Sequence, residues 1–396
     1  MTRPAPTIRL MLACLAALWL SGCAVPYGDV PHASYVSDAR CAPTGAEALP
    51  DPAALPLFFV TSRLPDCRTP QVTMLHHRGD RVRFGRFGPP TPVNDAVPLA
   101  IMADRLWWDN LAATGSDSGG RVILYVHGYR ESFATAARDT AQISRMTGFA
   151  GPVIAYSWPS QARLDKYVVD ETNMYWDQIN FRIFLKRLAE QGWAKEIIIV
   201  SHSLGARLVL PAIEYVDANS ADADARNISN IILQAPDIDR EDFERDVASQ
   251  LLTESKIMRD RRIHIYVSAR DRALALSRRI HGYPRLGSPY CFNPKDPQAL
   301  RLPGEQARCY PGTGGIVVRP DRAGIYVIDT TDVTRGPSGH SNFLQSAVAC
   351  DDFIAVIGGA RSAARREPTH LRHVFRLTRD PADPKPDHVA RCKIAS

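Results

Sequence analysis

The chain has 396 residues, 48 of them basic and 42 acidic, so its net charge at pH 7 is only +6. This mild excess, with no basic block interleaved with aromatic residues, argues against a nucleic-acid-binding protein. The length suits one large α/β domain with additions or two small domains, and we favour one domain.

The N-terminus has the pattern of an export signal. Two arginines precede an apolar run, Leu10–Leu20, which is too short to span a bilayer and leads into L-S-G-C at 20–23. This motif resembles a bacterial lipobox, in which the cysteine is acylated and becomes the mature N-terminus. We expect residues 1–22 to be a lipoprotein signal peptide and Cys23 the acylated residue, with an ordinary secretory signal as the alternative. Ala24, where an aspartate would retain the protein in the inner membrane, favours the outer membrane facing the periplasm.

Residues 23–56 are rich in Pro, Ala, Gly and Asp without periodicity, and they predict a tether. The folded domain is predicted to begin with strands at Leu57–Val60 and Arg81–Phe87, forming an antiparallel edge of a larger sheet. A buried strand, Arg121–His127, and a helix with apolar residues spaced from Phe133 to Ile143 follow.

Strands and helices then alternate along the chain. The strand Pro152–Trp158 precedes a long helix, Glu171–Gln191, whose Trp176, Ile179 and Ile183 share one face. The later predicted elements are the strands Ile197–Val200, Ile228–Ala235, Ile263–Ser268 and Gly324–Asp329, a helix near Asp242–Leu252, and a helical stretch within Ser341–Ile357. Such alternation predicts an α/β fold with a mostly parallel central sheet, flanked by helices on both faces, over residues 57–358.

Two segments fall outside this alternation. Residues 282–322, between the last two strands, are rich in proline and glycine and too long for a simple connection. Residues 359–396 are basic and contain prolines, which is typical of a partly ordered C-terminal extension.

The most informative segment is K-E-I-I-I-V-S-H-S-L-G-A-R-L-V-L at 195–210, a strand running directly into a helix with Ser203 at the corner. A serine on such a turn projects its hydroxyl out of the sheet, as in a nucleophile elbow. Small residues are needed two positions on either side, and Ser201 and Gly205 supply them. Pro211 should kink or end the following helix.

A serine hydroxyl needs a base to take its proton and an acid to orient that base. After Ser203, Asp271 follows the strand Ile263–Ser268 and His340 follows the last strand, which is the chain order Ser, Asp, His expected of an α/β hydrolase. Asp237 is the alternative acid, because some hydrolases of this fold take their acid one strand earlier.

Other readings of these aspartates remain open. Asp237 and Asp239 are also placed to cap a helix starting near Glu241, and Asp329 and Asp332 can be residues of a strand-end turn.

The negative oxygen of a tetrahedral intermediate requires fixed hydrogen-bond donors. The backbone N–H of Leu204, after the nucleophile, and that of Tyr129, in the His127-Gly128-Tyr129 loop, are the candidates for this oxyanion hole. His127 and His202 are interpreted as buried supporting residues. Four aromatic residues belong either to an acyl pocket or to the core: Trp158, Tyr167, Tyr175 and Trp176.

Beyond Cys14 and Cys23, six cysteines remain, and an even number in an exported chain suggests disulfides. We expect Cys291 to pair with Cys309 and staple the insertion; Cys41 with Cys67 and Cys350 with Cys392 are the next most economical pairs. No C-x-x-C pair or histidine-rich spacing appears, so we expect no metal site and no cofactor.

Several motifs in this order resemble an uncharacterised bacterial family of α/β-hydrolase-fold, esterase/lipase-like proteins. They are L-Y-V-H-G-Y, S-W-P-S, H-S-L-G-A-R, A-P-D-I-D, Y-V-S-A-R-D-R-A-L and the late Gly-His340-Ser, spread between Phe58 and Gly359. The resemblance implies the fold and a serine hydrolase, but no particular substrate.

We therefore expect a lipid-anchored serine hydrolase of the cell envelope, cleaving a small-molecule or lipid carboxylic ester through an acyl-enzyme. The alternatives are a non-catalytic lipoprotein that uses the fold as a binding scaffold, and an acyltransferase with the same three residues. The sequence determines neither the substrate nor the oligomeric state.

Overall fold

The computed structural model describes residues 41, 57–67, 72–88, 97–248, 261–289, 310, 324–359, 366–369, 371 and 373–378. All of them fall within one compact unit, Asp38–Ser396. Cys23 and the predicted signal peptide and tether, apart from Cys41, lie outside the described residues, as do Cys291, Cys309 and Cys392.

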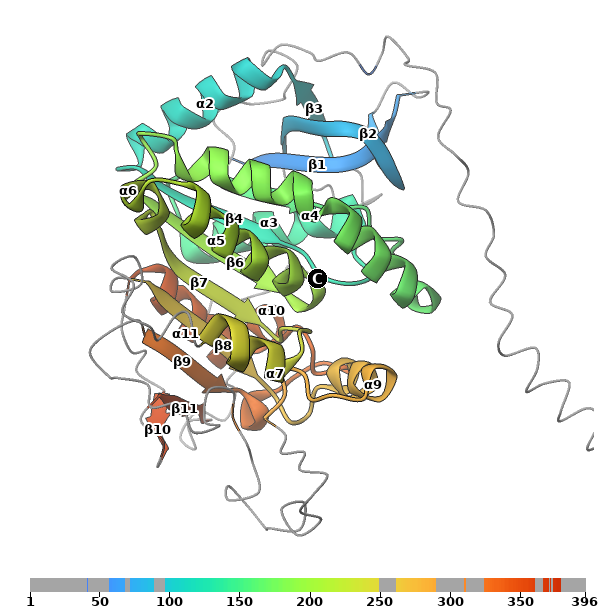
Figure 1. The fold of residues 1–396 in the computed structure, drawn as a ribbon, viewed down its shortest axis with the longest axis vertical. Coiled ribbons are helices and arrows are strands. Elements are labelled where there is room, and N and C mark those ends of the chain that lie inside the picture. The colour runs from blue at the N-terminus through green and yellow to red at the C-terminus, as the bar shows by residue number, and fades with distance from the viewer. Residues whose placement is uncertain are drawn as a thin grey trace, which may run out of the picture. The chain divides into compact units, whose positions relative to one another are not determined.

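The described strands form one 11-stranded sheet in the order β10-β11-β9-β8-β7-β6-β4-β5-β1-β2-β3 (Figure 1). Its strands are β1 Leu57–Asp66, β2 Thr73–Phe87, β3 Leu99–Met102, β4 Arg121–Val126, β5 Val153–Ser157, β6 Glu196–His202, β7 Ile228–Gln234, β8 Arg262–Val267, β9 Gly324–Asp329, β10 Arg366–Pro368 and β11 Val374–Leu377. The pairs from β1 and β5 through β4, β6, β7, β8 and β9 to β11 are parallel, whereas β2, β3 and β10 pair antiparallel at the two edges. The predicted α/β hydrolase fold with a mostly parallel sheet is confirmed.

Helices cover both faces of the sheet. The described helices are α2 Asp104–Asp117, α3 Phe133–Thr147, α4 Tyr167–Ala189, α5 Ala206–Asn219, α6 Asp222–Arg226, α7 Arg240–Asp242, α9 Arg272–His281, α10 Asn342–Gln345 and α11 Ala347–Ile357, with short 3-10 turns η3 Leu164–Lys166, η4 Ser203–Gly205 and η8 Thr331–Val333 and a π-helical turn η5 Phe243–Ala248. One core joins α2, α4 and α5 to the sheet and a second joins α3 and α11 to its other face. In Figure 1, α4 and α5 lie in front of the central strands. None of the described helices is long and apolar enough to cross a membrane.

The central parallel strands are where the apolar runs predicted them, and they are buried from both sides. Ile197 to Val200 of β6 are fully buried, as are Val122 to Val126 of β4. Such double burial explains why these runs are continuously apolar and do not alternate with polar residues. The parallel arrangement also brings the carboxyl ends of β4 and β6 to β9 to one edge of the sheet, where the loops that follow them meet.

Of the two predicted outcomes at Pro211, a kink or an end, the structure excludes the end, because helix α5 passes through Pro211. Proline has no N–H to give to the carbonyl four residues earlier, which belongs to Arg207. That carbonyl instead accepts a hydrogen bond of 3.2 Å from the side-chain amide of Gln178 in α4. A neighbouring helix thus satisfies the group that the proline leaves unpaired, and the helix continues to Asn219.

The sequence predicted that Trp176, Ile179 and Ile183 share one face of α4, and the structure shows that this face points outward, since Ile179 and Ile183 are each 55% exposed. Phe181 and Phe184, among others, supply the inward face. The sheet also continues past residue 358, because β11 pairs parallel with β9.

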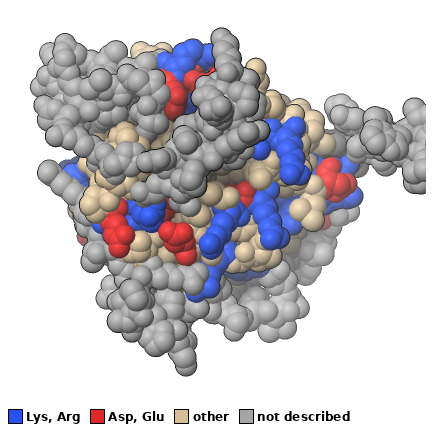
Figure 2. Space-filling model, turned by 90° about the horizontal axis from the view of Figure 1, so that it is seen from below, with Lys and Arg blue, Asp and Glu red and all other residues tan. Residues whose placement is uncertain are grey.

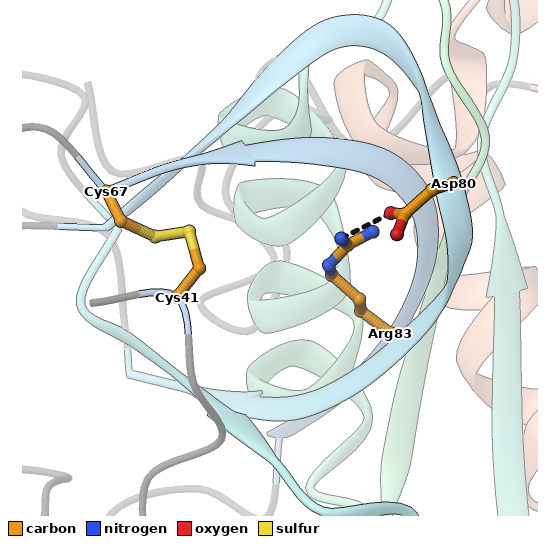
Figure 3. The surroundings of a disulfide bond; sticks show 4 residues. All are labelled: Cys41, Cys67, Asp80 and Arg83. Atoms are coloured by element: carbon orange, nitrogen blue, oxygen red, sulfur yellow. Dashed lines mark hydrogen bonds and ion pairs between the residues drawn. A yellow bond between two sulfur atoms is a disulfide. The ribbon is translucent and has the colours of Figure 1, made fainter. Parts of the chain in front are cut away.

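A disulfide joins Cys41 to Cys67 at the end of β1, which confirms that predicted pair (Figure 3). The same figure shows Arg83 and Asp80 of the long β2 strand in an ion pair of 2.5 Å. Cys350 in α11 is also disulfide-bonded, but its predicted partner, Cys392, lies outside the described residues.

Candidate active site

Ser203 stands at the turn between β6 and α5 in a backbone conformation that serine rarely adopts. Its φ is +52°, in the left-handed region, and such strain persists only where the surrounding structure holds it. The turn is also tightly packed, since a Cβ on Gly205 would lie 2.7 Å from the carbonyl oxygens of Val126 and His127. The residue types around the turn, small at 201 and 205, therefore match the requirement of a nucleophile elbow.

His340 and Asp271 are in direct contact. Nδ1 of His340 lies 2.7 Å from Oδ2 of Asp271, whose side chain is completely buried. The other carboxylate oxygen of Asp271 accepts the N–H of Leu274 at 2.9 Å, so Asp271 also caps helix α9. Two fixed partners therefore determine the orientation of this carboxylate and, through it, of the imidazole.

The charge of Asp271 changes the basicity of His340. Burial lowers the pKa of this imidazole, but the charge and the hydrogen bond of Asp271 outweigh burial and raise it above its usual value. A raised pKa is what an adjacent carboxylate produces when it stabilises the imidazolium form. His340 is thus suited to hold a proton transiently.

His340 also lies beside the elbow. Its ring centroid is 4.8 Å from that of His202, the residue preceding Ser203, and Nε2 of His202 is 3.3 Å from the His340 carbonyl oxygen. Ser203, Asp271 and His340, which are separated widely in the sequence, therefore gather at one edge of the sheet. They come from the loops after β6, β8 and β9.

The loop after β4 packs against the elbow at Gly128. A Cβ there would stand 2.8 Å from Cβ of Ser203, so only glycine fits. The Gly128 N–H donates to Glu131, whereas among the described groups none accepts the N–H of Tyr129. The Tyr129 amide therefore has no acceptor among the described groups, and its role in an oxyanion hole stays a prediction.

A buried polar network that the sequence reading missed holds this loop. One carboxylate oxygen of Glu131 lies 3.1 Å from the Gly128 nitrogen and 3.0 Å from Nδ1 of His202. The buried guanidinium of Arg63 donates to the Glu131 carbonyl at 2.8 Å, and Asp170 in α4 accepts the N–H of Arg130. The sequence signals for this network were weak: Arg63 lies in β1, Glu131 follows β4 and Asp170 lies in α4.

Burial raises the pKa of Glu131, yet the hydrogen bond of His202 and nearby His127 hold it below its usual value. We expect Glu131→Ala to cost about 2–3 kcal/mol of unfolding free energy, because it leaves the Gly128 N–H and His202 buried without their acceptor. Glu131→Gln, which keeps an acceptor for Gly128, is the matched control and should lose less. Urea unfolding of the three proteins measures this, and equal stability of wild type and Glu131→Ala would contradict it.

Asp237, the alternative acid, is hydrogen-bonded to groups other than His340. Its carboxylate accepts hydrogen bonds from Tyr167 at 2.6 Å, Ser277 at 2.7 Å and Arg285 at 2.7 Å. Burial raises its pKa, but the charges of Arg285 and Arg207 outweigh burial and lower it. The structure thus joins Asp271, and not Asp237, to His340. The backbone N–H of Asp237 nevertheless donates to the Ser203 carbonyl at 3.1 Å, which ties this network to the elbow.

The remaining candidate aspartates have local roles. Asp239 caps α7 by accepting the N–H of Glu241, as one reading of the sequence expected. Asp329 accepts hydrogen bonds from Tyr310 and Thr331. Asp332 lies 3.7 Å from Arg376 in a partly exposed pair.

The aromatic candidates divide between the core and the surface. Trp158 is fully buried and stacks on His127 with ring centroids 4.9 Å apart; burial lowers the pKa of His127 to about 4. These two stacked residues therefore pack against each other at the start of the loop after β4. Tyr167 belongs to the Asp237 network, whereas Tyr175 is 53% exposed. In the described part of the chain, no three side chains of the metal-ligating types cluster as a metal site would require.

The chain was compared with known families and proteins. Residues 109–301, just under half of the chain, match a family described as an alpha/beta hydrolase of unknown function (DUF900). This match confirms the resemblance drawn from the motifs. No curated protein matches the chain.

Proposed function

Because residues 109–301 match an α/β hydrolase family, we propose that the protein is a serine hydrolase that cleaves carboxylic esters through an acyl-enzyme. Ser203, His340 and Asp271 are its catalytic triad. The observation that carries this proposal is the 2.7 Å contact of His340 with Asp271 beside a serine held at a φ of +52°.

Each group has a defined task in this mechanism. Oγ of Ser203 attacks the ester carbonyl carbon, and Nε2 of His340 accepts the hydroxyl proton. Asp271 holds Nδ1 and stabilises the imidazolium that forms, while the N–H groups of Tyr129 and Leu204 donate to the oxyanion. The imidazolium returns the proton to the leaving alkoxide. Water then repeats the sequence on the acyl-enzyme and releases the acid.

A fluorophosphonate probe tests the proposal, because it labels an activated serine irrespective of the natural substrate. We expect stoichiometric labelling of the full-length protein, mapped by mass spectrometry to the peptide that contains Ser203. A properly folded protein that remains unlabelled would favour a non-catalytic binding scaffold. Hydrolysis of short-chain soluble esters measures turnover in the same sample.

We further propose that the protein is a lipoprotein of the outer membrane facing the periplasm, anchored through Cys23. The apolar run and the L-S-G-C motif at 20–23 support this location. Mass spectrometry of protein extracted from membranes should find a diacylated or triacylated cysteine at the mature N-terminus, and Cys23→Ser should block this processing. A soluble product beginning at another residue would contradict the anchor.

A further inference from the structure

Helix α9 presents an unusual outer face. Leu276, Ile280 and Tyr283, at and just beyond its C-terminal half, are 58%, 52% and 53% exposed. The spacing of four residues places Leu276 and Ile280 on one side of the helix, away from the buried Leu274, and Tyr283 follows the helix just beyond its C-cap, Gly282. Single exposed apolar residues are ordinary, but three in one short segment form a contact surface.

The charged side chains that α9 itself carries are all basic. Arg270, Arg272 and Arg279 are exposed and form no ion pair with any described residue. The segment 270–285 contains one acidic residue, Asp271, which is buried and occupied by His340. Figure 2 shows one face of the molecule, on which several basic side chains lie right of the centre and a few acidic ones lie near them. The outer face of α9 is therefore both apolar and cationic.

Exposed apolar residues also occur on a neighbouring part of the chain. Leu164 in η3 and Val168 in the first turn of α4 are 73% and 55% exposed. This end of α4 adjoins α9, because the Tyr167 hydroxyl lies 3.2 Å from Oγ of Ser277 and Nε2 of His281 lies 3.0 Å from Oε1 of Glu171. We call Leu164, Val168, Leu276, Ile280 and Tyr283, with Arg270, Arg272 and Arg279, the rim surface.

The rim surface is physically continuous with the candidate active site. Asp271, which holds His340, is the N-cap of α9, so this helix starts at the triad. On the other side, the Tyr129 hydroxyl donates to the carbonyl of Leu164, which links η3 to the proposed oxyanion loop. Whatever binds the rim surface is therefore brought next to Ser203.

We propose that the rim surface docks the protein on a membrane containing anionic lipids, with α9 lying in the headgroup region. A helix with apolar residues flanked by arginines binds at this interface, since its apolar side chains enter the acyl boundary and its cations meet phosphate groups. A second copy is the less suitable occupant, because two such faces would oppose arginines to arginines. Docking requires no catalytic turnover and is separate from the proposed hydrolysis.

The outer stripe of α4 provides an internal comparison. Ile179 and Ile183 are as exposed as Val168, but Ile183 lies 15 residues further along the helix, roughly 22 Å away. The neighbouring part of α4 contacts α2 through the ion pair of Arg187 with Asp104. If exposure alone decided membrane contact, these isoleucines would touch lipid as readily as Leu276 and Ile280.

The experiment reconstitutes the full-length protein, purified from membranes, into vesicles that contain a diazirine-bearing phospholipid. Photolabelled peptides are mapped by mass spectrometry. In phosphatidylcholine vesicles with about one-third phosphatidylglycerol, we expect peptides covering 272–283 to be labelled at least fivefold more than peptides covering 176–186. Labelling of 272–283 should fall severalfold in pure phosphatidylcholine and in Arg272→Gln/Arg279→Gln. Arg81→Gln/Arg105→Gln, which removes two other exposed arginines, is the charge-matched control and should label like wild type.

Equal labelling of the two regions, or labelling of 272–283 that ignores lipid charge, would overturn the proposal. Ser203→Ala separates docking from chemistry, because it should keep the labelling pattern even though it cannot form an acyl-enzyme. If the protein is not labelled by the fluorophosphonate but retains the lipid contacts, the proposed hydrolase activity is wrong and the proposed docking surface is still supported. The reverse result would disprove only the docking.

Discussion

Ser203→Ala is expected to abolish fluorophosphonate labelling and to lower ester hydrolysis by about 10⁴-fold or more, since loss of the nucleophile removes the covalent route. The residual rate would come only from substrate binding and the oxyanion hole. Alanine at this position removes one oxygen from a fully folded turn, so the unfolding free energy should change little. Initial rates on a soluble ester and the extent of probe labelling provide the measurements.

Ser201→Ala is the matched control for this variant. Ser201 lies two residues away on the same strand end, and its buried hydroxyl has no partner among the described residues. Its removal should leave activity within a few-fold of wild type. If Ser203→Ala remained active, or if Ser201→Ala were equally inactive, Ser203 would not be the nucleophile.

Asp271→Asn is expected to lower kcat by about 10⁴-fold, because asparagine cannot hold the imidazole in the tautomer that accepts the serine proton. The stability cost should be small, since asparagine caps a helix about as well as aspartate and can still accept the Leu274 N–H. The comparison of rate with unfolding free energy thus separates orientation of His340 from capping of α9.

The pH profile provides a second measurement on the same variant. His340 must be neutral to act as a base, and Asp271 raises its pKa against the effect of burial. The rate of the wild type should therefore rise with pH through a pKa above the ordinary histidine value of about 6.5. Asp271 makes the largest contribution that opposes burial, ahead of the charges of Asp237 and Glu131, so the acid limb of Asp271→Asn should move to lower pH. An unshifted acid limb would contradict the pairing.

Asp237→Asn is the matched comparison. We expect it to lower the free energy of unfolding much more than it lowers kcat. Its carboxylate is buried between Arg285 and Arg207, and removing one partner of a buried ion pair costs about 3–5 kcal/mol. Because the folded-state pKa of Asp237 is lowered, its contribution is present above the unfolded pKa and is lost as pH falls through the folded one. If Asp237→Asn lost kcat as severely as Asp271→Asn, the assignment of the acid would be wrong.

The sequence by itself determined the fold class and the succession of the core strands along the chain. Apolar runs such as Ile197–Val200 are buried from both sides, and their continuity is a local property of the chain. It also indicated which residues follow which strand ends, and since parallel strands carry those ends to one edge, Ser203, Asp271 and His340 were expected to converge. The Cys41–Cys67 pair was among those expected because the two cysteines are close in the sequence, 26 residues apart.

Only the tertiary structure decided which acid contacts His340, because Asp237 and Asp271 both follow parallel strands and differ only in their neighbours in space. The two arginines that bind Asp237 are far from it in the chain: Arg207 is 30 residues upstream and Arg285 is 48 residues downstream. The sequence also gave no indication that Glu131 and Arg63, which are 68 residues apart, hold the loop after β4. The tertiary structure also decided how α5 continues past Pro211, since the Gln178 amide in α4 binds the Arg207 carbonyl. It likewise decided which side of α4 faces the core, because apolar residues are spread around that helix. Long-range contacts that satisfy buried polar groups are set by the packed fold, and periodicity along the chain does not encode them.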